Sequence, residues 1–134
     1  MKLNLSALAA GLGLLISVPM FAHHSFEAEY DSNKPINITG SVTKVEWMNP
    51  HARFYVDVKD EKGVVTNWNF ELGSPNVLTR QGWRRDSLKV GDTVSVEGYM
   101  AKDGAKLGNA RRVTLADGRK VFAGSAAGEG GPQQ

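Results

Sequence analysis

Short β-rich runs separated by turn residues make up most of the chain after residue 35, and this pattern constrains the fold more than any other feature. The clearest run, ARFYVDV at 52–58, alternates apolar and polar side chains. A period of two is typical of a strand that has one face in a core. The residues DEKG at 60–63 then predict a hairpin turn, and VVTNWNFEL at 64–72 predicts the returning strand.

The segments on either side of this hairpin predict a bent strand and one short helix. In INITGSVTKVEW at 36–47, the apolar residues change from one face to the other near Gly40, which indicates a strand that carries a bulge. In GSPNVLTRQG at 73–82, Ser74 suits the N-cap, a proline suits the first helical position and Gly82 suits the C-terminal stop.

Two further runs, VGDTVSVEGYMA at 90–101 and KDGAKLGNARRVTLADGR at 102–119, predict the fourth and fifth strands. We therefore expect a mainly β fold over residues 36–122. The element order favours a five- to six-stranded OB-like barrel with one short helix between the third and fourth strands, because a helix commonly lies there in OB-folds. A small sandwich is the alternative.

Residues 1–22 have the three-part pattern of a secretory signal peptide. Lys2 precedes a long apolar stretch, which ends at Pro19 and the small residue Ala22. We expect cleavage after Ala22, export to the periplasm and no membrane span in the mature protein. A membrane anchor is the alternative, because the apolar run approaches the ~18–20 residues that span a bilayer.

The remaining segments flank the predicted barrel. Residues 23–35 are polar and predict an N-terminal arm, and the Gly- and Ala-rich residues 123–134 predict a disordered tail.

Composition excludes several classes of protein. The 134-residue chain has a formal net charge of +2, and loss of Lys2 with the signal leaves 16 − 1 = 15 basic residues against 14 acidic ones. That balance argues against a nucleic-acid partner bound through a basic surface. The chain has no cysteine, so disulfides and thiolate metal sites are excluded.

Two of the three histidines, His23 and His24, directly follow the predicted cleavage site. As the first mature residue, His23 can chelate a metal ion through its free α-amine and its imidazole Nδ1. A further imidazole completes a three-nitrogen site of the kind called a histidine brace. Copper suits such nitrogen ligands and leads the divalent affinity order, so we expect a copper ion as the cofactor.

The third histidine, His51, follows Asn49-Pro50 at the start of the second predicted strand. His24 alone supports a rival site, in which the terminal amine and the backbone amide of His24 bind Cu(II) without any fold. A site that also includes His51 depends on the folded barrel to bring this residue to the others. The twelve residues from His24 to Pro35 span at most roughly 40 Å, which permits the arm to reach His51.

Other side chains suggest surface contacts or packing. Arg53 and Tyr55 lie on the polar face of their strand and are the candidates for contact with a ligand or partner. The three tryptophans are expected to pack on the core. Glu71 lies on the strand face opposite Trp68 and receives no assigned role.

Several motifs resemble a family of small exported bacterial proteins that is catalogued only as a domain of unknown function. The most specific are HHSF at 23–26 and WMNPH at 47–51, and WNFE at 68–71 also fits. The resemblance covers residues 22 to about 122. It implies an exported β-barrel and implies no activity.

Three functions follow from these residues. We favour a non-enzymatic periplasmic protein that holds copper through His23, His24 and His51 for storage, delivery or protection. The alternative is an accessory module that presents Arg53 and Tyr55 to a periplasmic or membrane-associated enzyme. A copper-dependent oxidase is the third hypothesis, and it is disfavoured because a few aromatic residues alone could serve as a substrate platform.

Overall fold

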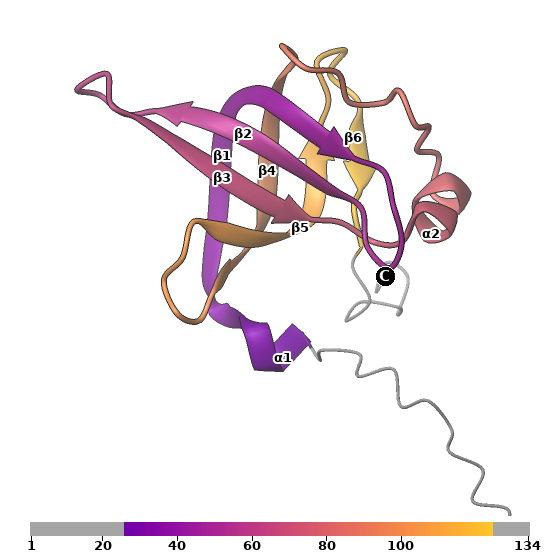
Figure 1. The fold of residues 1–134 in the computed structure, drawn as a ribbon, viewed down its shortest axis with the longest axis horizontal. Helices are drawn as coiled ribbons and strands as arrows, with labels where there is room; N and C mark the ends of the chain where they lie inside the picture. The colour runs from indigo at the N-terminus through magenta and orange to yellow at the C-terminus, as the bar shows by residue number, and fades with distance from the viewer. Residues whose placement is uncertain (1–25, 125–134) are drawn as a thin grey trace, which may run out of the picture.

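Strands dominate the part of the chain that the computed structural model describes, residues 26–124 (Figure 1). The elements in chain order are α1 (Phe26–Glu29), β1 (Tyr30–Glu46), β2 (Arg53–Lys59), β3 (Val65–Glu71), α2 (Pro75–Arg80), β4 (Thr93–Ala101), β5 (Leu107–Thr114) and β6 (Lys120–Phe122). The predicted signal peptide, His23, His24 and residues 125–134 of the predicted tail lie outside the described residues.

The first five strands form a closed ring. β1 pairs antiparallel with β2 and β4, β2 pairs antiparallel with β3, and β4 pairs antiparallel with β5. The ring closes where β3 pairs parallel with β5 over three residues, and β6 pairs antiparallel with the last residues of β5. Because α2 lies between β3 and β4, this topology confirms the predicted OB-like barrel with a helix between its third and fourth strands.

β1 belongs to both halves of the barrel because it bends. Its first part, as far as Ser41, pairs with β4, and its last part pairs with β2. The register with β2 shifts between Val42 and Lys44, which confirms the predicted bulge. Gly40 lies at the bend, where a Cβ atom would overlap the carbonyl oxygen of Asp57 on β2. The close approach of the two backbones therefore requires glycine at this position.

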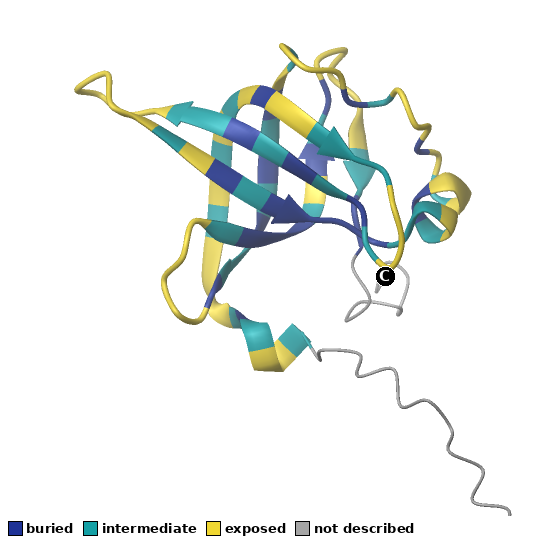
Figure 2. Ribbon diagram, viewed as in Figure 1, coloured by how far each residue is buried: buried dark blue, intermediate teal, exposed yellow. Residues whose placement is uncertain are grey.

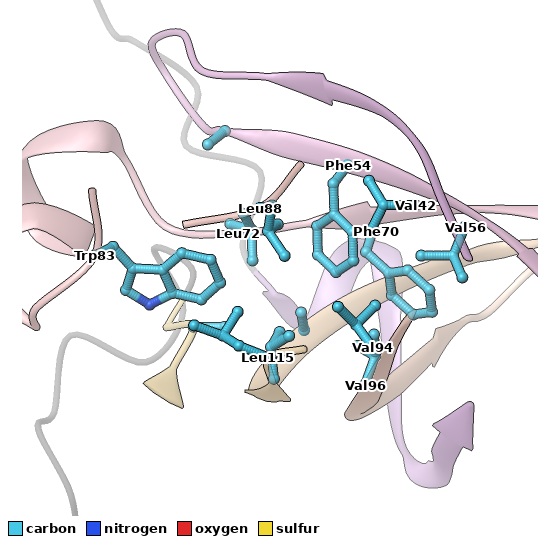
Figure 3. Close-up of a cluster of buried hydrophobic side chains, with 14 of the residues drawn as sticks. Val42, Phe54, Val56, Phe70, Leu72, Trp83, Leu88, Val94, Val96 and Leu115 are labelled. Atoms are coloured by element: carbon cyan, nitrogen blue, oxygen red, sulfur yellow. The ribbon is translucent and has the colours of Figure 1, made fainter. Parts of the chain in front are cut away.

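The core fills the ring with aliphatic and aromatic side chains from all five of its strands (Figure 3). The rings of Phe54 and Phe70 stack at 5.3 Å between centroids, and Trp68 stacks on Phe70 at 6.0 Å. Buried and partly buried residues alternate along most of β2 and β4, as Figure 2 shows, which is the period of two that the sequence predicts.

α2 is built as the sequence predicts. The Ser74 side chain accepts a hydrogen bond from the Val77 amide at 3.4 Å, a proline opens the helix, and Gly82 follows it with a φ of 92°. The chain then returns to the core, where Trp83 is 1% exposed and its indole nitrogen donates to the carbonyl oxygen of Phe122 at 2.7 Å.

Two boundaries differ from prediction. β1 begins at Tyr30 rather than Ile36, and α1 precedes it, so part of the predicted arm is helix and strand. The reason is that Tyr30 is 2% exposed and pairs with Ala101 of β4, although the residues after it are polar. Ala123, placed in the predicted tail, is fully buried because its amide donates to Arg111 and its carbonyl oxygen accepts from Gly73.

Candidate functional site

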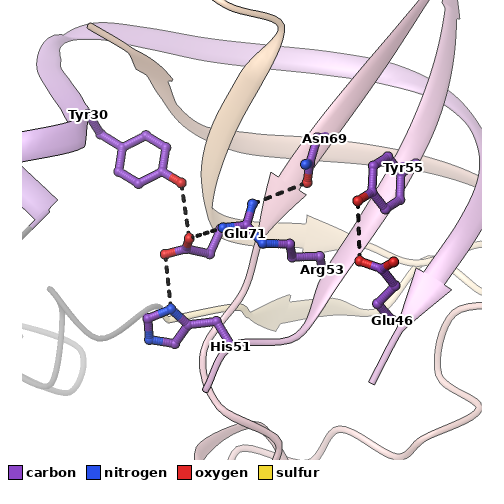
Figure 4. A network of polar contacts seen from close by, with 7 residues as sticks. All are labelled: Tyr30, Glu46, His51, Arg53, Tyr55, Asn69 and Glu71. Carbon is purple, nitrogen blue, oxygen red and sulfur yellow. Dashed lines mark hydrogen bonds and ion pairs between the residues drawn. The ribbon is translucent and has the colours of Figure 1, made fainter. Parts of the chain in front are cut away.

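A buried carboxylate, that of Glu71, organises a polar cluster at one end of the barrel (Figure 4). Glu71 is the last residue of β3 and is 7% exposed. Its Oε2 accepts hydrogen bonds from Arg53 Nη2 at 2.7 Å and from the Tyr30 hydroxyl at 3.2 Å. Its Oε1 lies 3.4 Å from His51 Nδ1. Three elements therefore bring donors to one carboxylate, which offsets the cost of burying its charge.

The register of the sheet explains why these residues meet. Arg53 opens β2 and is the direct cross-strand partner of Glu71, so the two side chains share one face. Backbone hydrogen bonds then hold the end of the β1–β2 loop against the end of β3: the Ala52 amide donates to Gly73, and the Leu72 amide donates to Ala52. His51 is consequently held beside Glu71.

The contact with Glu71 orients the His51 ring. The Nδ1 side faces the carboxylate, and Nε2 points away from it (Figure 4). A carboxylate beside Nδ1 favours the tautomer with its hydrogen on that nitrogen, which leaves the Nε2 lone pair available to a ligand. The His51 side chain is 22% exposed, so solvent reaches the ring.

Tyr30 serves as a hydrogen-bond donor to the cluster. Burial, followed by the negative charge of Glu71, raises the pKa of its phenol above the ordinary value. The hydroxyl therefore keeps its proton at neutral pH. Because Tyr30 opens β1, this bond connects the N-terminal end of the described chain to Glu71 at the end of β3.

The predicted contact residues Arg53 and Tyr55 take part in different groups. Arg53 bonds Glu71 and also donates to Asn69 Oδ1 at 3.4 Å. The Tyr55 hydroxyl donates to Glu46 Oε2 at 3.2 Å, and the Lys44 ammonium lies 5.1 Å from the centroid of the Tyr55 ring. Hydrogen bonding from Lys44 is the main cause that lowers the pKa of Glu46.

Of the three predicted metal ligands, His51 lies in the described structure, and His23 and His24 lie outside it. Within residues 26–124, no group of three or more histidine and carboxylate side chains is arranged to hold a metal ion.

Sequence reasoning missed Glu71 and Tyr30. The matching core faces of the two strands could have identified Glu71, because placing Phe54 opposite Phe70 brings Arg53 opposite Glu71. The contact of Tyr30 with Glu71 joins residues 41 apart and has no local signal.

A second polar feature lies between the segment before β4 and the β5–β6 turn. It is a hollow of about 500 Å³ whose charged lining consists of Arg84, Lys89, Arg119, Asp86, Asp92 and Asp117. Three positive and three negative side chains balance each other, so the hollow favours neither anions nor cations.

Among the described residues, no helix is long and apolar enough to cross a membrane.

Taken together, the fold and the cluster define a small OB-like β-barrel whose β1–β2 loop carries a histidine oriented by a buried glutamate. The chain belongs to the family of unknown function DUF6152, whose model matches residues 13–111. This confirms the resemblance to a family without assigned activity.

Solved structures similar to this chain include a domain of another bacterial protein. The dimeric N-terminal domain of the PriB protein from Thermoanaerobacter tencongensis is similar at 18% identity, with a TM-score of 0.43 over 62% of this chain and 96% of that domain. No curated protein matches the chain.

Proposed function

We propose that the exported form of this protein is a non-enzymatic periplasmic copper-binding protein. It holds one Cu(II) ion through the α-amine and imidazole of His23 together with His24 and His51. The protein then stores or delivers copper, or protects other molecules from it, and the barrel is a rigid platform for the site.

The observation that carries this proposal is the orientation of the His51 ring. A histidine that binds a metal commonly has its other ring nitrogen beside a carboxylate, which fixes the ring and increases the basicity of the ligand nitrogen. Glu71 Oε1 lies in that position, 3.4 Å from Nδ1. Arg53 and Tyr30 in turn hold Glu71, so the support extends beyond the carboxylate itself.

The donor types favour copper over other metals. An amine and imidazoles are nitrogen ligands, and copper binds them most tightly among the divalent first-row metals. Zinc also accepts imidazole but favours a tetrahedral arrangement. Because each donor must lose its proton before it binds, copper affinity should weaken as the pH falls.

Native mass spectrometry of protein exported by a bacterial cell tests the proposal directly. We expect a first residue of His23 and one bound copper ion in a single spectrum. A protein that begins at another residue, or that carries no copper after incubation with Cu(II), contradicts the proposal.

Competition titrations with Cu(II) then test the ligands. One added residue ahead of His23 removes the chelate ring and should weaken binding by roughly 100-fold, or about 2.7 kcal/mol. His51→Gln should weaken it similarly. Tyr55→Phe is the matched control, because it removes a hydroxyl-to-carboxylate bond outside the Glu71 cluster. Equal affinity in all four proteins argues against the site.

Among the described residues, both side chains named in the accessory-module hypothesis bond to other groups of the barrel. Arg53 is bonded to Glu71 and Asn69, and Tyr55 is bonded to Glu46. Both side chains are thus engaged within the barrel.

A further inference from the structure

Within residues 26–124, one edge of β3 is paired along the whole strand and the other edge only at its end. All seven residues of Val65–Glu71 pair with β2. On the opposite edge, β5 pairs with the stretch from Asn69 to Glu71. The β2–β3 hairpin extends beyond the barrel in Figure 1, so the first part of this second edge faces outward. We call residues 64–68 the open edge of β3.

The hydrogen-bond pattern identifies the backbone groups at the open edge. The Asn69 amide donates to the carbonyl oxygen of Lys106, next to β5, so it points away from β2. Directions alternate along an antiparallel strand, and the amides and carbonyls of Val65 and Asn67 therefore also point away from β2. None of the described residues pairs with them on that side. Unpaired strand groups of this kind are a template for another strand.

The side chains of the open edge also suit another strand. Val64 and Val65 are 58% and 55% exposed. The sequence VVTNW at 64–68 contains no charged residue, proline or glycine. Native proteins commonly block an edge strand with charges or proline, and the open edge has neither. Because it is uncharged, a second copy of the same edge meets no electrostatic repulsion from it.

We propose that the open edge of β3 pairs antiparallel with the open edge of a second copy of this chain. The resulting dimer is symmetric and goes beyond the proposed copper site. Val65 lies opposite the partner's Asn67, so each free amide and carbonyl of these residues bonds across the pair. The twofold axis passes beside Thr66, which faces the partner's Thr66.

The free backbone groups select this register. A shift by two residues in one direction places Asn67 opposite the partner's Gly63, a residue whose amide already donates within the hairpin turn. The opposite shift places Val65 opposite the partner's Asn69, a residue whose amide already donates to Lys106. Either shift therefore leaves free groups unpaired.

The same register brings complementary side chains together. Val64 lies opposite the partner's Trp68, and Thr66 lies opposite the partner's Thr66. Pairs of an aromatic with a β-branched residue, and pairs of threonines, are combinations that stabilise antiparallel strands. Both occur here at non-hydrogen-bonded positions, where side chains approach most closely. Val64, which is 58% exposed in the single chain, thereby gains an apolar neighbour.

Disulfide trapping tests the register, because the chain has no native cysteine. Opposed Cα atoms at a non-hydrogen-bonded position lie about 4.5 Å apart, which a disulfide can bridge. Thr66→Cys in the exported protein should therefore give a covalent dimer on a non-reducing gel after oxidation with diamide. Val65→Cys is the matched control. Val65 is more exposed than Thr66, but its copy in the partner lies diagonally at about 7–8 Å, so it should cross-link at least about tenfold more slowly.

Charge substitution tests the same contact without a cross-link. Thr66→Lys and Thr66→Glu each place like charges across the axis and should weaken dimerisation at least about tenfold in analytical ultracentrifugation. An equal mixture of the two variants should dimerise again, because opposite charges then face each other. Thr93→Lys makes the same substitution at an exposed residue of β4 and should dimerise like the wild type.

Two results would overturn the proposal. Wild-type protein that stays monomeric at ~1 mM excludes a second copy as the occupant, and a strand from another protein then becomes the alternative. Equal cross-linking of Thr66→Cys and Val65→Cys, or no dimer in the mixture of charged variants, excludes the symmetric register.

Discussion

At the scale of single residues, the molecule depends on how the charge of Glu71 is accommodated. A carboxylate that is 7% exposed is costly unless donors surround it. Here Arg53 supplies a charge-assisted bond, Tyr30 supplies a neutral one, and the His51 ring lies at the remaining oxygen. The same arrangement that makes burial tolerable also fixes the direction of the histidine.

Replacement of this carboxylate should therefore cost stability even without a metal. Glu71→Gln keeps the shape but leaves Arg53 without its charge partner, and we expect a loss of about 2 kcal/mol in the free energy of unfolding. Urea denaturation measures it. Glu97→Gln is the control, because Glu97 pairs with Arg112 at 3.1 Å on the surface and should cost less than about 1 kcal/mol. Similar small losses in both variants would mean that Glu71 is not a structural centre.

At the scale of elements, the bend of β1 decides how the ring closes. A single strand serves both halves of the barrel because its backbone passes very close to β2 at Gly40. Val42 is buried just before the bulge, and the exposed Thr43 within it shifts the alternation, so that Val45 packs against the core after it. The position of the β1–β2 loop, and with it that of His51, follows from this bend.

A side chain at the bend should strain the sheet. In Gly40→Ala the new methyl group would meet the Asp57 carbonyl and a methyl carbon of Val56, so we expect a loss of about 1–3 kcal/mol. The neighbouring exposed substitution Ser41→Ala should change stability by less than about 0.5 kcal/mol. Thermal and urea unfolding compare the two. Equal stabilities would show that the strands separate easily at this point.

At the scale of the whole molecule, closure of the ring joins distant parts of the chain. The Asn69 amide donates to the carbonyl oxygen of Lys106, and the Val42 amide donates to that of Asp92. Each bond spans dozens of residues, so neither can open alone without disrupting the pairing around it. The tip of the β2–β3 hairpin can open locally, because the Lys62 amide donates to the side chain of Asp60, two residues away.

Amide hydrogen exchange should report this difference. We expect the Asn69 and Val42 amides to exchange with opening free energies that agree within about 1 kcal/mol, as members of one cooperative unit. The Lys62 amide should exchange far faster. Fast exchange at Asn69 with slow exchange at Val42 would indicate that the β3–β5 seam opens independently of the barrel.

The local features of the fold were predictable because they arise from neighbouring residues. Alternation in β2 follows from the two-residue period of a strand, and the limits of α2 follow from Ser74 and Gly82. Even the pairing of Arg53 with Glu71 was contained in the matching core faces of β2 and β3. The amino-acid order by itself therefore determined β2 to β5, the turns beside them, α2 and the barrel class.

Only the tertiary structure decided that Tyr30 and His51 join Glu71. The polar residues after Tyr30 give no sequence signal for the start of β1. The strand nevertheless begins there, because the Tyr30 ring is buried against the barrel and its hydroxyl bonds to Glu71. The cluster needs the ends of three strands and a loop to converge, and such convergence depends on ring closure rather than on local periodicity. For the same physical reason, the sequence marks His51 as a candidate ligand, but only the folded barrel shows the direction of its ring.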